Sequence, residues 1–165
     1  MNKYVCLILI AIFSVACNNS TENKKEITVR EQDGIKKFSK EEIKKLTEEG
    51  YKILEFIDPK TKDTIMMQQY FMAFLKKGQN RSQSKQGADS LQRLHLAHLK
   101  RMYELGYADI SGPFGDLGDI RGITIYSVPT IEMADSLANA DPIVKAGRLE
   151  IEMHPWWAGK GLPLR

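Results

Sequence analysis

The stretch "ADPIVKAGRLEIEMHPWW", residues 140–157, contains the local signals for the last helix and the last strand of the fold. Asp141 followed by Pro142 is typical of a helix start, with the aspartate as N-cap and the proline at the first helical position. Gly147 is typical of a helix end. The alternation of apolar and charged residues in Leu149–Met153 then predicts a strand that buries one face. We therefore predict a short helix followed by a closing strand.

The segments before this stretch predict an alternating series of strands and helices. Apolar patterning, capping residues and glycines predict a strand over 64–75, a helix over 88–105, strands over 107–111 and 121–128, a helix from 129, the short helix from 141 and the strand over 149–153. Strand, helix, strand, strand, helix, strand is the split βαβ order of ferredoxin-like folds. We therefore predict an α+β fold, a ferredoxin-like βαββαβ sandwich.

A helix and a strand are predicted before this core. Ser39 and Glu42 have the spacing of a capping box, and Gly50 is a helix stop. Residues 51–57 have the apolar, β-branched and aromatic composition of a strand. We assign residues 39–63 to an N-terminal extension and residues 64–160 to the ferredoxin-like domain.

The first 38 residues predict export and anchoring. Lys3 precedes an apolar run, Tyr4–Phe13, which is shorter than the ~20 residues of a membrane span and has the length of a secretion signal. Residues 1–16 are therefore predicted to be a signal peptide. Residues 14–17, Ser-Val-Ala-Cys, resemble the lipobox of bacterial lipoproteins, although the usual first-position leucine is replaced by serine.

Cys17 is accordingly the predicted lipidation site, followed by a polar tether over 17–38. The alternative is an ordinary signal peptide with an incidental cysteine. The prediction places the protein in the bacterial cell envelope, exported and anchored to a membrane, with the domain facing the periplasm or lying at the outer membrane.

Cysteine content and charge exclude several classes of function. Cys6 and Cys17 are the two cysteines of the chain, so the mature domain contains no cysteine nucleophile, CxxC redox motif or cysteine-ligated zinc site. Removing Lys3 reduces the 24 basic residues to 23, against 21 acidic residues. A nearly neutral chain without a basic stripe does not predict a nucleic-acid partner.

Three segments together resemble a known family: "HLAHLKRMYELGYADISGPFGD" (95–116), "RGITIYSV" (121–128) and the stretch at 140–157. They are similar to YciI-like (YCII-related) domains, and the resemblance extends over 69–159. It implies a ferredoxin-like fold of the dimeric α+β barrel group, a homodimer formed by two sheets packed face to face, and a pocket between sheet and helices.

The resemblance also implies candidate catalytic residues. Family members are expected to be small enzymes, one branch removes chloride from a hydroxylated aromatic ring, and a His-Asp pair is the proposed chemistry. The matching positions are His95 and Asp141. A histidine transfers protons near neutral pH, and a carboxylate orients it. The alternative is that His95 is a buried core residue and that Asp141 only caps a helix.

Four further residues are candidates for a substrate pocket: His98, Phe114, Arg121 and Tyr126. Arg121 at a strand start suits an anionic substrate, or it pairs with a nearby aspartate. His98 lies one turn from His95, but too few further ligands accompany this pair, so we predict no metal and no cofactor. The glycine-rich segment 112–118 lacks the lysine of a P-loop and predicts a hairpin.

We therefore expect a lipid-anchored domain that uses a His-Asp pair for acid-base chemistry on a small aromatic or acidic molecule, in the manner of a lyase or dehalogenase. The alternative is a non-catalytic small-molecule-binding or structural domain of the envelope. The discriminating observation is whether His95 and Asp141 meet and face an open cavity.

Overall fold

The computed structural model of the protein describes residues 38–162 and residue 164. The predicted signal peptide (1–16), Cys17 and nearly all of the predicted tether (17–38) lie outside the described residues. Within those described ranges, no helix combines the length and the apolar character that crossing a membrane requires.

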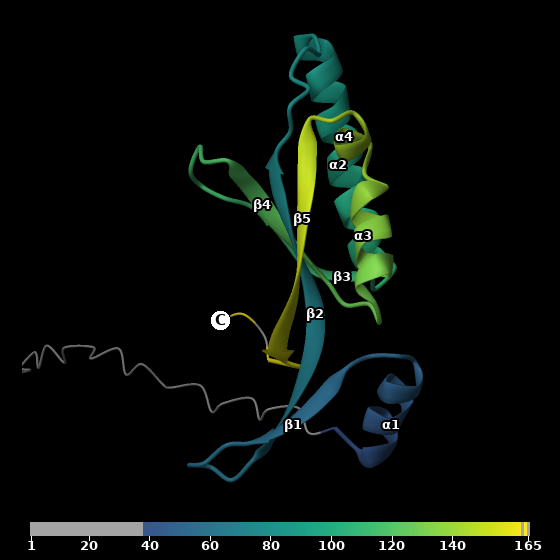
Figure 1. Ribbon diagram of the computed structural model, residues 1–165, viewed down its shortest axis with the longest axis vertical. Helices are drawn as coiled ribbons and strands as arrows, with labels where there is room; N and C mark the ends of the chain where they lie inside the picture. Colours follow the sequence, from purple (N-terminus) through teal and green to yellow (C-terminus); the bar gives the residue numbers. More distant parts are fainter. Residues whose placement is uncertain (1–37, 163, 165) are drawn as a thin grey trace, which may run out of the picture. The chain divides into compact units, whose positions relative to one another are not determined.

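The elements follow the predicted order along the chain (Figure 1). They are α1 (Lys40–Glu48), β1 (Ile53–Ile57), β2 (Thr64–Lys77), α2 (Lys85–Glu104), β3 (Ala108–Pro113), β4 (Ile120–Tyr126), α3 (Ile131–Asn139), α4 (Pro142–Lys145) and β5 (Leu149–Gly159).

The strands form one antiparallel sheet in which β2 is central. One edge of β2 pairs with β1 over residues 64–68 and with β4 over residues 71–76, whereas β5 pairs with β2 over residues 67–77. Because β3 lies beyond β4, the core order is β5-β2-β4-β3. Counted along the chain from β2, this is the order 4-1-3-2 of a ferredoxin-like sheet. The predicted α+β fold class is confirmed.

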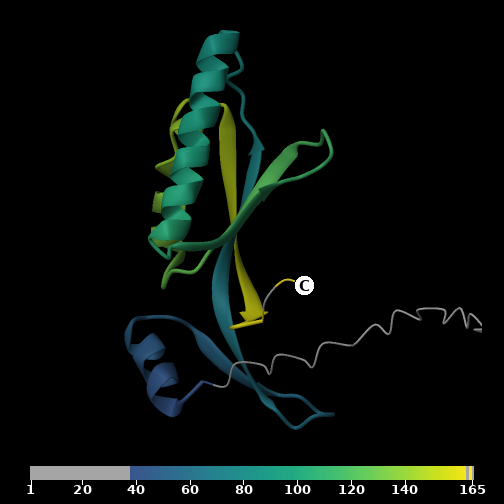
Figure 2. The ribbon, with the colours of Figure 1, turned by 180° about the vertical axis from the view of Figure 1, so that it is seen from behind.

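The helices α2 and α3 cover the same face of the sheet, as the two opposite views show (Figures 1 and 2). Alternate residues of β2 point to this face and are buried: Phe71, Ala73 and Leu75. Ala73 and Ala134 of α3 have no exposed surface, and such small side chains let a helix approach the sheet closely. The core therefore lies between one sheet face and two helices.

Two elements differ from their predicted bounds by three or more residues at one end. The helix α2 begins at Lys85 rather than at residue 88, because Ser84 is its N-cap and accepts a hydrogen bond from the Gly87 amide at 3.2 Å. The strand β5 runs beyond Met153 to Gly159. Its proline, Pro155, is tolerated because β5 lies at the edge of the sheet, where an absent N–H leaves no partner unpaired.

The predicted capping box at the start of α1 is confirmed. The Glu42 amide donates to Ser39 Oγ at 3.1 Å, and the Ser39 amide donates to Glu42 Oε2 at 2.8 Å. No residue of α1 is buried, whereas β1 joins the sheet and the Tyr51 hydroxyl donates to the Ser127 carbonyl at 3.2 Å. The extension is therefore tied to the domain through β1 and Tyr51.

Candidate functional site

The helix α2 turns one narrow stripe of side chains towards the sheet, and His95 belongs to it. His95 and Met102, two turns apart, are the buried residues of this helix. Several apolar residues of α2 lie outside this buried stripe, since Leu94, Leu96 and Tyr103 are at least half exposed. His95 itself is 7% exposed, so a polar ring sits where the helix meets the core.

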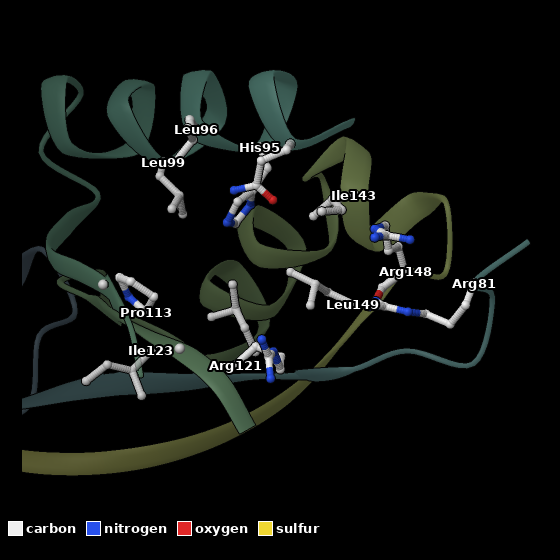
Figure 3. A pocket seen from close by; sticks show the side chains of 14 residues that line it. Arg81, His95, Leu96, Leu99, Pro113, Arg121, Ile123, Ile143, Arg148 and Leu149 are labelled. Atoms are coloured by element: carbon white, nitrogen blue, oxygen red, sulfur yellow. The ribbon is translucent and has the colours of Figure 1, made fainter. Parts of the chain in front are cut away.

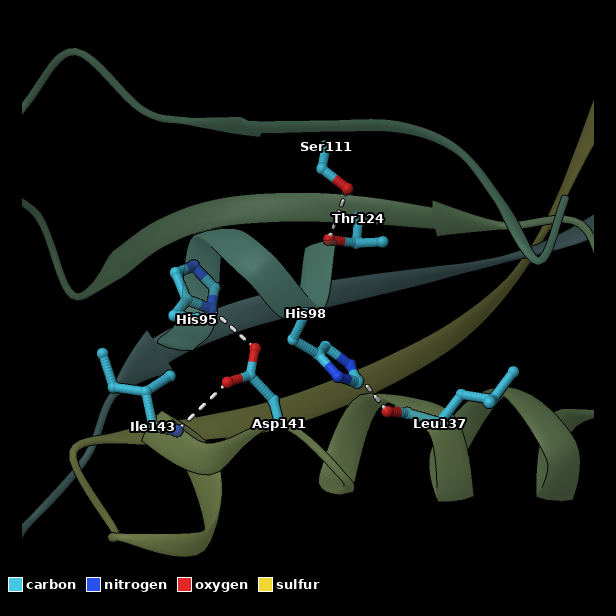
Figure 4. A network of polar contacts seen from close by, with 7 residues as sticks. All are labelled: His95, His98, Ser111, Thr124, Leu137, Asp141 and Ile143. Carbon is cyan, nitrogen blue, oxygen red and sulfur yellow. Dashed lines mark hydrogen bonds and ion pairs between the residues drawn. The ribbon is translucent and has the colours of Figure 1, made fainter. Parts of the chain in front are cut away.

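Asp141 caps the short helix α4 and binds His95 at the same time (Figure 4). One carboxylate oxygen, Oδ1, accepts from the Ile143 amide at 3.0 Å, while Oδ2 lies 2.6 Å from Nδ1 of His95. The side chain is almost fully buried. Capping and pairing with histidine are therefore both performed by Asp141, with one oxygen for each.

This contact fixes the orientation of the imidazole. A carboxylate only accepts hydrogen bonds, so Nδ1 of His95 carries the proton that faces Asp141. When the ring is neutral, the lone pair is then on Nε2, which has no hydrogen-bond partner among the described residues. The pair therefore presents one unpaired ring nitrogen, the arrangement of a general base.

A cavity of about 330 Å³ lies between α2, the hairpin of β3 and β4, and the segment that joins α4 to β5 (Figure 3). His95 lines it, whereas Asp141 does not and supports the imidazole from behind. Polar and apolar surface contribute equally to its wall, and the large aliphatic residues are Leu75, Leu96, Leu99, Ile123, Ile143 and Leu149. The cavity has the size typical of a small-molecule site.

Of the four residues predicted to form the pocket, Arg121 lines this cavity and the other three do not. His98 faces α3 instead, where its Nε2 donates to the Leu137 carbonyl at 3.1 Å. Phe114 lies in the connection between β3 and β4, with 45% of its surface exposed. Tyr126 packs in the core beneath the helices. The sequence pattern indicates which side of a helix or strand faces the core. It does not indicate whether a side chain on that side reaches the cavity.

The remaining sequence features of this region are structural. The segment 112–118 is a hairpin connection, in which the Phe114 amide donates to the Arg121 carbonyl at 3.0 Å. Across the two strands of this hairpin, Ser111 Oγ lies 3.0 Å from Thr124 Oγ1 (Figure 4). In the part of the chain that the structure describes, no group of three or more His, Cys, Asp or Glu side chains is arranged to hold a metal ion.

Two arginines of the cavity were not found by the sequence reasoning, Arg81 and Arg148. Arg81 lies in the polar loop before α2, and Arg148 lies between the helix-ending Gly147 and the first residue of β5. Backbone hydrogen bonds join these segments, from Gly78 to the Arg148 carbonyl and from Asn80 to the Gly147 carbonyl, each at 3.0 Å. Arg148 directly precedes the predicted closing strand, which is a weak sequence signal, whereas Arg81 lies in the middle of a loop and gives no signal.

The buried Tyr126 makes stability sensitive to alkaline pH. Burial, followed by the nearby charge of Asp141, raises the pKa of the Tyr126 phenol well above its ordinary value. Above pH ~10 the Tyr126 phenol therefore ionises in the unfolded chain while it stays neutral in the folded chain. The free energy of unfolding then falls as pH rises, by up to about 1.4 kcal/mol per pH unit.

Tyr126→Phe should weaken this pH dependence of the free energy of unfolding, as urea unfolding at pH 8 and pH 11 would measure. Tyr103→Phe, at an exposed position, is the control. An unchanged pH dependence in Tyr126→Phe would contradict this account.

No family model and no curated protein matches this chain. The chain is similar to the solved structure of 5-chloro-2-hydroxyhydroquinone dehydrochlorinase (TftG) from Burkholderia phenoliruptrix AC1100 in complex with 2,5-dihydroxybenzoquinone. The two are 23% identical, the match covers 53% of this chain and 92% of that chain, and the TM-score is 0.41. The ferredoxin-like assignment therefore rests on the strand order and register of this chain.

Proposed function

We propose that the domain is a small enzyme of the YciI-like type, in which His95 is the general acid-base group and Asp141 positions it. The observation that carries this proposal is the buried His95–Asp141 contact of 2.6 Å behind a cavity that His95 lines. A carboxylate that holds Nδ1 keeps Nε2 aimed at a bound molecule and stabilises the imidazolium that forms when a proton is taken up.

The neighbouring histidine of the same helix provides an internal comparison. His98 is bonded to the Leu137 backbone carbonyl and joins two helices without lining the cavity, as a structural histidine does. His95 instead has a buried carboxylate partner and an unpaired nitrogen on the cavity side. Buried titratable pairs of this kind are concentrated at functional sites.

The lining residues also favour a type of reaction. They include no Ser, Thr, Cys, Lys, Asp or Glu side chain, so His95 is the residue there that is suited to exchanging protons near neutral pH. Proton transfer, without a serine or cysteine nucleophile, is therefore the chemistry that we assign. In a lyase or dehalogenase reaction on a saturated pair of carbons, His95 takes a proton from one carbon, the electron pair of the broken C–H bond forms a carbon–carbon double bond, and a halide ion leaves from the adjacent carbon.

The test is turnover of a panel of chlorinated hydroquinones and halogenated organic acids, followed by chloride release. The enzyme proposal expects turnover of at least one compound, with a loss of about 100-fold or more in His95→Gln, which is the size of a general-base contribution. His98→Gln, which keeps an N–H donor for the Leu137 carbonyl, should stay within about threefold. Full turnover in His95→Gln would exclude His95 as the base. Tight binding of panel members without any turnover would favour the alternative, a non-catalytic binding domain.

A second proposal concerns the location of the protein and is based on the first residues of the sequence. We propose that the protein is exported and anchored in the bacterial envelope through lipid on Cys17, since a short apolar run, small residues and a cysteine precede a polar segment. Labelling cells with a radioactive fatty acid tests this. Label on the wild-type chain and none on Cys17→Ala is the expected result, and label retained on Cys17→Ala would contradict it.

We also propose a homodimer formed through the sheet face that α2 and α3 leave uncovered. Its central strand presents Met72 and Phe74 there, and β5 adds Trp156, which is 40% exposed and packs 6.2 Å from the Tyr70 ring. The resemblance to dimeric α+β barrels supports a second copy of the chain as the occupant. Sedimentation equilibrium should give twice the chain mass, and Phe74→Glu should give a monomer. A monomeric wild-type chain would exclude the dimer.

A further inference from the structure

The charged side chains around the cavity are all of one sign. Three arginines line it, Arg81, Arg121 and Arg148, and no aspartate or glutamate does. A guanidinium remains protonated at any pH at which the protein is folded. The cavity that His95 faces therefore has three permanent positive charges within its wall.

Within the described part of the chain, no carboxylate pairs with these three arginines. Arg81 donates to the Arg148 carbonyl at 3.1 Å, Arg148 to Gln83 Oε1 at 3.1 Å, and Arg121 to the Gly118 carbonyl at 3.2 Å. All three acceptors are neutral, and among residues 38–162 no carboxylate lies within ion-pair distance of any of the three. By contrast, Lys76 on the outer face of the sheet is paired with Glu152 at 2.8 Å.

The arginines approach the cavity from two sides. Arg81 and Arg148 extend from the two segments joined by the backbone bonds of Gly78 and Asn80, and Arg121 extends from the start of β4 (Figure 3). His95 enters from α2 on the opposite wall. Each guanidinium has five N–H donors and uses one in the bonds described, so most donors remain available. Positive charges that line one cavity repel one another, and an anion bound between them offsets this repulsion.

We propose that the molecule bound in this cavity carries an oxyanion, a carboxylate in particular, which Arg121 and Arg148 hold while Arg81 adds charge. The molecule also has a compact apolar part, because six large aliphatic side chains line the cavity and the space is about 330 Å³. This inference names the substrate class of the proposed enzyme and rests on that function for the reacting group, His95. The arginines bind and orient the substrate, while His95 exchanges the proton.

An arginine-bound carboxylate also assists proton removal. When His95 takes a proton from a carbon next to the carboxylate, the electron pair moves onto the carboxylate oxygens. Guanidinium donors already in place stabilise this added negative charge. The pair then returns to form the carbon–carbon double bond as the leaving anion departs. The three arginines therefore stabilise the negative charge that forms when His95 removes the proton.

The experiment measures binding to the full chain, independently of turnover. Benzoate and hexanoate are titrated by calorimetry, with their neutral amides, benzamide and hexanamide, as matched probes. The wild type should bind at least one carboxylate about tenfold or more tightly than its amide, and this preference should weaken as salt increases. Arg121→Gln and Arg148→Gln should each lose about tenfold or more of carboxylate affinity, as expected for charged hydrogen bonds.

Two controls separate this inference from its alternatives. Arg93→Gln, on the exposed side of α2, should leave carboxylate affinity within about twofold. His95→Gln should also retain binding, because the base is not the anion site, so a failure of the proposed chemistry leaves the binding result intact. Equal affinity for carboxylate and amide, or an equal loss in Arg93→Gln and Arg121→Gln, would overturn the inference. If Arg148→Gln does not fold, Arg121→Gln provides the measurement.

Discussion

Replacing Asp141 with alanine is expected to lower the free energy of unfolding by about 2–4 kcal/mol. The change removes the N-cap of α4, whose loss costs ~1 kcal/mol, and leaves Nδ1 of the buried His95 without a partner, which costs about 1–3 kcal/mol. Urea unfolding at pH 7, followed by circular dichroism, measures the difference. Asp141→Asn is the matched variant, because an amide oxygen caps α4 and its volume is the same.

Asp141→Asn should separate stability from function. Its free energy of unfolding should stay within about 1 kcal/mol of the wild type, since asparagine caps a helix as well as aspartate does. Turnover should nevertheless fall about 100-fold or more, because a neutral amide neither selects the Nδ1–H tautomer nor stabilises an imidazolium. Wild-type turnover in Asp141→Asn would restrict Asp141 to a structural role. An unchanged stability of Asp141→Ala would mean that neither bond contributes to folding.

The second large effect is expected for Gly78→Ala, at the junction of the loop after β2 with the start of β5. A Cβ atom at this position would lie 2.3 Å from the Gly147 carbonyl oxygen and 2.8 Å from the Arg148 carbonyl carbon. Both contacts are with backbone, so no side-chain rotation relieves them. The two segments must separate, which breaks the Gly78 amide bond to the Arg148 carbonyl. We expect a loss of about 3 kcal/mol, at the upper end of overpacking effects.

The control for this change is Gly115→Ala, where a Cβ meets nothing within 4 Å. Its stability should change by less than about 1 kcal/mol. In addition, Gly78→Ala should weaken carboxylate binding, because the displaced segments carry Arg81 and Arg148. Denaturant unfolding and the benzoate titration measure the two effects. Equal stability of the two variants would show that the junction accommodates a methyl group without cost.

Local signals predicted most of the fold. The capping residues Ser39 and Asp141 and the stop at Gly147 each act through neighbours two to four residues away, so they are readable in the sequence. The order of strands and helices then limits the sheet to few arrangements. The predicted start of α2 is three residues late, because Gly87 has a low helix propensity but lies in the first turn of the helix.

The site was less accessible to sequence reasoning because it joins distant segments. His95 and Asp141 are 46 residues apart, and their contact was expected from resemblance rather than from spacing. Helical periodicity placed His98 on the buried side but did not indicate that it faces α3. Arg81 gave no pattern at all, since its place in the cavity depends on hydrogen bonds between a loop and the segment before β5. Cavities formed by such contacts require the assembled fold.

The pairing of β2 with β5 has a consequence for how the chain acquires its structure. Met67 pairs with Gly159 and Lys77 pairs with Leu149, so one edge of the central strand stays open until residues 149–159 reach it. Pairings between such distant segments form slowly, since the intervening chain must first be ordered. The edge of β2 that β5 covers therefore stays unpaired until late in folding, and the sheet is complete only when residues 149–159 have joined it.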